Sequence, residues 1–209
     1  MSERDADLRP GAPGADARTA SQRPRGSRVA DAVLDATLAL LVERAYSFSV
    51  EDVARRARVH KTTVYRRFTT KAALVGAAIE RMSIAQVPVV ESADPLADLV
   101  ALAEAVARVL SGPDGARITR AVIVAASEDA EVLTVARRFL AGRFDAATQI
   151  VGRAVAAGQL RAGTDPVLLW AAIVTPLQMR ALLGHPASEA TARDLVALAL
   201  EGAGTTSRR

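Results

Sequence analysis

The sequence predicts an all-α fold, and three observations support that prediction. Half of the 209 residues are hydrophobic, which is enough apolar material for a substantial core. Apolar side chains recur at helical spacing, about every 3.6 residues, through most of the chain. No stretch alternates apolar and polar residues as a half-buried strand would, and no hairpin turn signal occurs. We therefore expect about nine helices and no sheet.

The N-terminal part of the chain predicts a tail followed by four helices. Residues 1–27 contain almost no large apolar side chain and a small excess of basic residues. They predict a disordered basic tail that is solvated or touches the phosphates of a polyanion. Ser49 is a good N-cap for the second helix, and Asp52 completes a capping box. Thr69 or Thr70 caps the fourth helix. The predicted spans are 28–44, 50–57, 61–68 and 71 to at most 87.

The remainder of the chain predicts five further helices. Asp-Pro pairs at residues 94–95 and 165–166 each place an N-cap before a proline at the first helical position. The Gly-Pro pair at residues 112–113 ends one helix, and Gly158 ends another. The predicted spans are 94–110, 116–126, 129–157, 165–183 and 188–200.

The composition argues against an enzyme, a metal site or a bound cofactor. The chain has no cysteine and only two histidines, so thiol nucleophiles, Cys-ligated metals and His-based triads have little or no basis. No glycine-rich phosphate loop occurs, and the acids at 128–131 are explained by the dipole of the helix that they open. The longest apolar run, residues 167–177, is too short to cross a bilayer. The first residues lack a signal-peptide pattern, so we expect a soluble, cytoplasmic protein.

One segment concentrates the basic charge. Residues 55–71 contain seven basic residues and no acidic one, whereas residues 77–209 carry a net charge of −1. This asymmetry favours a polyanion partner such as nucleic acid, and a solvated basic face is the alternative. A membrane-surface role is disfavoured, because Val64 and Phe68 are needed for packing and leave no apolar face for lipid. The basic residues are Arg55, Arg56, Arg58, Lys61, Arg66, Arg67 and Lys71.

Two short helices joined by a tight turn, after a longer helix, predict a helix-turn-helix. In the second short helix, Val64 and Phe68 are four residues apart and point into the core. The outer faces then carry residues that suit the major groove, where Lys or Arg can bind guanine and a threonine methyl can meet thymine. These outer residues are Lys61, Thr62, Thr63, Arg66 and Arg67.

Residues 48–74 resemble the DNA-binding domain of TetR-type (tetracycline-repressor-like) transcriptional regulators. The resemblance is carried by the pattern Thr63, Tyr65, Phe68 and Lys71. It implies three parts: the basic tail, a helix-turn-helix domain over 28–86, and a helical regulatory and dimerisation domain over 87–209.

Three positions depart from the pattern of the family. Ala45 stands where glycine is common after the first helix. Arg58 stands where the turn usually has glycine, so it must adopt a backbone conformation that glycine adopts more easily. His60 replaces the usual serine or threonine cap of the recognition helix. Its ring could cap that helix, contact a phosphate, or simply be exposed in the turn.

The resemblance also implies roles for individual residues. The outer residues of the second short helix face bases or adjacent phosphates. Tyr65 gives its hydroxyl to a phosphate while its ring packs, although a plain core tyrosine is the alternative. Lys71 contacts the DNA backbone, and Ser49 combines its capping role with a phosphate contact.

For the C-terminal part, the resemblance implies dimerisation and a small effector. The helices at 165–183 and 188–200 carry more apolar residues than one face needs, which favours a dimer interface over burial within the subunit. Several residues could line a pocket for a small hydrophobic effector, although core or interface positions are the alternative: Phe139, Phe144, Trp170, Gln178 and Met179.

The expected function is therefore that of a homodimeric repressor that an effector releases from a palindromic double-stranded operator. The alternatives are an activator and a regulator that senses no small molecule.

Overall fold

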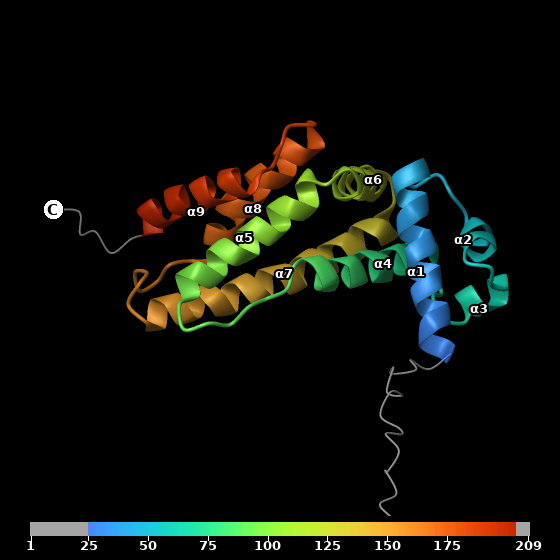
Figure 1. The fold of residues 1–209 in the computed structure, drawn as a ribbon, viewed down its shortest axis with the longest axis horizontal. Helices are drawn as coiled ribbons and strands as arrows, with labels where there is room; N and C mark the ends of the chain where they lie inside the picture. Colours follow the sequence, from blue (N-terminus) through green and yellow to red (C-terminus); the bar gives the residue numbers. More distant parts are fainter. Residues whose placement is uncertain (1–24, 204–209) are drawn as a thin grey trace, which may run out of the picture.

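The computed structural model describes residues 25–203, so most of the predicted N-terminal tail lies outside the described residues. Within this range the chain forms nine α-helices and no strand, which confirms the predicted fold class (Figure 1). None of these helices is both long enough and apolar enough to cross a membrane. The helices are α1 (Arg25–Arg44), α2 (Val50–Arg56), α3 (Lys61–Tyr65), α4 (Lys71–Gln86), α5 (Pro95–Ser111), α6 (Pro113–Glu128), α7 (Ala130–Ala156), α8 (Pro166–Leu182) and α9 (Glu189–Ala203).

Helices α1 to α4 form one end of the molecule, with α2 and α3 on its outer side (Figure 1). Val33 and Leu41 of α1 pack with Val53 of α2 and Leu74 of α4 in a common apolar core. Two residues of α6, Ile118 and Ala121, belong to the same core. Helices α1 to α4, called the reading head below, are therefore packed directly on α6 of the C-terminal part.

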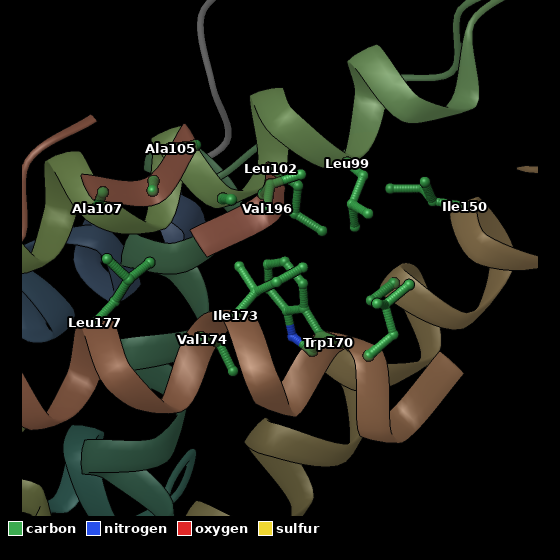
Figure 2. Packing of buried hydrophobic residues seen from close by; sticks show 14 of the residues in the cluster. Leu99, Leu102, Ala105, Ala107, Ile150, Trp170, Ile173, Val174, Leu177 and Val196 are labelled. Atoms are coloured by element: carbon green, nitrogen blue, oxygen red, sulfur yellow. The ribbon is translucent and has the colours of Figure 1, made fainter. Parts of the chain in front are cut away.

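Helices α5, α7, α8 and α9 surround a second core in the other half of the molecule. Figure 2 shows Trp170, Ile173 and Leu177 of α8 directed toward α5, with Ile150 of α7 next to Leu99 of α5. Trp170 is almost completely buried. Burying a large aromatic ring together with branched aliphatic side chains provides most of the stability of such a bundle.

Several helix ends differ from the predicted ones, and the C-terminal ends of α6 and α9 lie two to three residues further along the chain. Helix α1 begins at Arg25, three residues inside the predicted tail. Helix α6 begins at Pro113, because proline needs no hydrogen-bond acceptor at the first helical position and therefore starts this helix. Helix α3 ends at Tyr65 rather than Phe68, although the Phe68 N–H still donates to the Val64 carbonyl at 2.9 Å. The last predicted turn is thus present as a hydrogen-bonded turn that leads toward α4.

The two departures from the family's glycines both have a left-handed backbone conformation, which was expected for Arg58. Ala45 and Arg58 have φ values of 51° and 55°, in the left-handed region that glycine favours. Each costs about 1 kcal/mol relative to the right-handed conformation. Both occupy short connections within the reading head, where the chain must reverse direction before α2 and before α3.

Candidate functional site

The start of α2 is fixed by a reciprocal cap. The Asp52 N–H donates to Ser49 Oγ at 3.1 Å, and the Ser49 N–H donates to Asp52 Oδ2 at 2.8 Å. Hydrogen bonds from Ser49, followed by one from Arg55, lower the pKa of Asp52 to about 2. A lowered carboxyl pKa stabilises the folded state above about pH 4 and loses this effect as the pH falls toward 2. Ser49 is thus confirmed as the cap, while its phosphate contact stays a prediction.

Helix α3 presents one face to the core and the opposite face outward. Val64 is only 1% exposed, and Phe68 packs against the same core, as the spacing predicted. The outward side chains of Lys61, Thr62 and Arg66 are exposed, as are those of Tyr65 and Arg67, and Thr63 is half-buried. The helix therefore carries a polar, basic surface suited to the major groove of DNA.

The seven basic residues of the segment 55–71 do not all face outward. Arg55 pairs with Asp52 of its own helix. Arg56 forms a two-pronged pair with Glu43 of α1, with N···O distances of 2.6 and 2.7 Å. By contrast, Arg58, Lys61 and Arg66 form no ion pair with any residue that the structure describes, and all are exposed. The segment 55–71 thus contains basic residues that form ion pairs within the protein and others that form an exposed basic surface.

Lys71 differs from the role that the resemblance implied. Its Nζ donates to the Tyr46 carbonyl at 2.5 Å and lies 3.5 Å from the centroid of the Tyr46 ring. Burial lowers the pKa of Lys71, and burial together with Asp129 and Glu131 raises the pKa of Tyr46 to about 12. In this arrangement the ammonium group joins α4 to the segment before α2. It is bound by Tyr46 rather than directed outward toward a phosphate. Sequence reasoning missed Tyr46, because it lies far from Lys71 along the chain.

His60 occupies the N-cap position of α3, but its ring makes no capping hydrogen bond. Its Nδ1 lies 3.4 Å from the Thr62 hydroxyl, and the side chain is exposed. The capping alternative is therefore wrong. The exposed ring can contact a phosphate or solvent. By contrast, Thr70 caps α4 and also bonds Glu131 of α7, which ties the end of the reading head to the C-terminal part.

A cavity of about 480 Å³ lies among α4, α5, α6, α7 and α8. Four of the five predicted pocket residues line it: Phe139, Phe144, Trp170 and Gln178. The prediction for Met179 is wrong, because its side chain is 50% exposed and does not line the cavity. Neighbouring residues on a helix point about 100° apart, and at this place on α8 Gln178 faces the cavity whereas Met179 faces solvent.

Most of the lining residues could not be identified from sequence, because they are spread over five helices that are distant along the chain. Ile79 and Met82 come from α4, and Val122 comes from α6. Each has the helical spacing of an ordinary core residue. Only the packing of five helices shows that these side chains border a cavity.

Comparison with known proteins gives the family. A model for the bacterial regulatory proteins of the tetR family matches residues 33–78, and one for the tetracyclin repressor-like C-terminal domain matches residues 89–199, more than half of the chain. The chain belongs to the TetR family. This TetR-family protein is therefore a DNA-binding transcriptional regulator, and the family is not one of enzymes.

The similarity extends over most of the chain. The HTH-type regulator AqdR of Rhodococcus erythropolis is 32% identical over 146 residues, covering 69% of this chain and 70% of AqdR. The uncharacterised HTH-type regulator YdeS of Bacillus subtilis is 29% identical over 188 residues, covering 88% and 94%. The crystal structure of the TetR-family regulator SCO0332 has a TM-score of 0.70 at 29% identity and covers 84% of this chain and 98% of that one.

Proposed function

We propose that this TetR-family regulator is a cytoplasmic homodimeric repressor, which a small hydrophobic effector releases from a palindromic operator. We also propose the division into a DNA-binding domain over 28–86 and a regulatory domain over 87–209. The observation that carries the proposal is the two-sided character of α3, with Val64 buried and Lys61, Thr62 and Arg66 exposed.

The DNA contacts follow from the outward surface of α3. Lys61 and Arg66 would bind guanine or adjacent phosphates, and the methyl groups of Thr62 and Thr63 would meet thymine. Arg67 and the hydroxyl of Tyr65 would contact phosphates at the edge of the groove. Ser49 is a weaker candidate, because its hydroxyl already serves the cap.

The dimer interface is proposed on α8 and α9. Leu168 is 68% exposed and Leu198 is 66% exposed, and Met179 and Leu183 are also exposed. Leu168, Met179 and Leu183 recur at helical spacing along or just after α8, so they form one apolar stripe. A second copy of the chain would bury this stripe and would place two α3 helices in successive major grooves.

The effector would act through α4, which borders the cavity and follows the helix-turn-helix directly. Ala72, Val75 and Ile79 of α4 line the cavity. A ligand that fits the cavity better when α4 is displaced would favour a dimer whose reading heads no longer match the operator.

The test is binding of the purified protein to the DNA upstream of its own gene, with random competitor DNA present. We expect a complex that survives the competitor, contains two chains per site and weakens steeply between about 50 and 200 mM salt. If the random competitor abolishes binding to the upstream DNA and to every other genomic fragment equally, the protein is not a sequence-specific repressor.

A further inference from the structure

The charges around the cavity are all of one sign. Its described lining contains no aspartate and no glutamate, and its charged members are Arg137 and Arg143, both on α7. The rest of the surface consists largely of aliphatic and aromatic side chains, together with a few uncharged polar ones. An apolar cavity whose charged side chains are all basic suits a ligand with an apolar body and a negatively charged group.

Arg143 is the more buried of these two arginines. One of its terminal nitrogens donates to the Val87 carbonyl at 2.9 Å, where α4 ends. Within the described part of the chain it has no carboxylate partner. Burial lowers the pKa of its guanidinium group, but a guanidinium stays charged in proteins. A single bond to a carbonyl leaves most of its five N–H donors for another acceptor.

A second arginine on the same helix shows the usual solution for such a charge. Arg153 donates to the buried carboxylate of Asp98 at 2.5 Å and to the Ser92 carbonyl at 3.0 Å. The described residues therefore supply Arg153 with an acid, but supply none to Arg143 beside the cavity. Half-buried charges are stable when they are paired. An anionic group of a ligand would therefore supply the partner that Arg143 lacks.

We propose that the cavity selects an amphipathic anion, whose apolar body packs against Phe144 and Trp170 and whose carboxylate or similar oxyanion pairs with Arg143. This proposal rests on the effector role of the cavity and adds the chemical class of the effector. A planar guanidinium can bind a carboxylate through two parallel hydrogen bonds, which also orients the ligand. A cationic ligand would meet two like charges and no acid.

The probes are decanoate, decyl phosphate and the neutral decan-1-ol, which share one apolar chain. Trp170 is the only tryptophan of the protein and lines the cavity, so its fluorescence reports binding directly. We expect at least one of the two anions to bind about 10 to 100 times more tightly than the alcohol, as for hydrogen bonds to charged groups. The two anions distinguish a carboxylate from a phosphate ester.

The variants separate anion binding from the structural bond to Val87. Arg143→Gln should abolish the preference for the anion while the alcohol binds as before, and Arg143→Lys should keep part of the preference. Arg138→Gln is the matched control, because Arg138 is exposed on the same helix and does not line the cavity. Circular dichroism verifies that each variant is folded.

Four results would overturn the inference. Equal binding of anion and alcohol by the wild type, or an unchanged preference in Arg143→Gln, would leave the cavity as an effector site without anion selection. Absence of binding by both anions while the alcohol binds would do the same. Absence of binding by all three probes at millimolar concentration would reject both the anion and the effector role of the cavity.

Discussion

Lys71 stands at the first position of α4, where its ammonium group meets both the carbonyl and the ring of Tyr46. The Phe48 ring is also close, with its centroid 4.7 Å from Nζ. This single side chain therefore connects the segment between α1 and α2 with the start of α4. It therefore helps to hold the segment before α2 against the start of α4.

Lys71→Met should lower the free energy of unfolding by about 1–2 kcal/mol, because it removes a cation–π contact and a hydrogen bond. The salt dependence of operator binding should not change, since Nζ faces Tyr46. Urea unfolding and a salt titration of DNA binding measure the two effects. A fall of about one in the salt slope would instead show a phosphate contact, as the resemblance implied.

Local patterns predicted those residues whose roles depend on near neighbours in the sequence. The spacing of Val64 and Phe68 and the cap formed by Ser49 and Asp52 were predicted correctly. Lys71 could not be placed in this way, because its partners depend on how α4 meets α1. The same limit applies to Arg56, whose partner Glu43 lies on another helix.

At the scale of helices, α4 and α7 approach each other closely beside the cavity. A Cβ built at Gly76 would lie 2.3 Å from Val135 Cγ1. Valine has two heavy atoms on Cβ and one strongly preferred rotamer in a helix, so it moves aside only at a cost. The absence of a side chain at Gly76 thus allows the two helices to pack side by side, as Figure 1 shows.

Gly76→Ala should lower the free energy of unfolding by about 1–2 kcal/mol, because overpacking outweighs the gain in helix propensity. Urea unfolding at a fixed protein concentration measures this change. The double variant Gly76→Ala/Val135→Ala should be less destabilised than the sum of the two single variants. A stabilised Gly76→Ala protein would show that α4 and α7 do not pack this closely.

Most helices could be predicted because their starts carry local signals. Asp94, Asp165 and Thr70 each cap a helix at the predicted place. The start of α6 was missed, because Gly112 is both the C-cap of α5 and the N-cap of α6, so that one helix follows the other directly. The cavity was not predictable at this scale, since it depends on the arrangement of five helices.

At the scale of the whole molecule, the apolar residues of α8 and α9 fall into two groups, one buried in the subunit core and one exposed on its surface. Leu169, Ile173 and Leu177 of α8 are buried within the subunit, so only part of the predicted apolar excess faces outward. Leu195 also packs against the subunit core, which makes Leu168 and Leu198 the better probes of dimerisation. Sequence could not separate the two groups, because both recur with helical spacing.

Leu198→Glu and Leu168→Glu should each give a folded monomer with weak operator affinity, because a buried, unpaired carboxylate disfavours association. Sedimentation equilibrium measures the oligomeric state. Ile84→Glu is the matched control, since Ile84 is 67% exposed on α4 and should leave a dimer intact. Intact dimers in both leucine variants would place the interface elsewhere.

The central claim is that the outward face of α3 reads the operator sequence. The most direct measurement is the affinity of Lys61→Ala and Arg66→Ala for a panel of single-base operator variants. Arg56→Ala serves as control, because Arg56 pairs with Glu43. We expect each α3 variant to lose discrimination of about 1–3 kcal/mol at symmetric positions in the two half-sites, while the control keeps it. Unchanged base preference in both α3 variants would contradict this account.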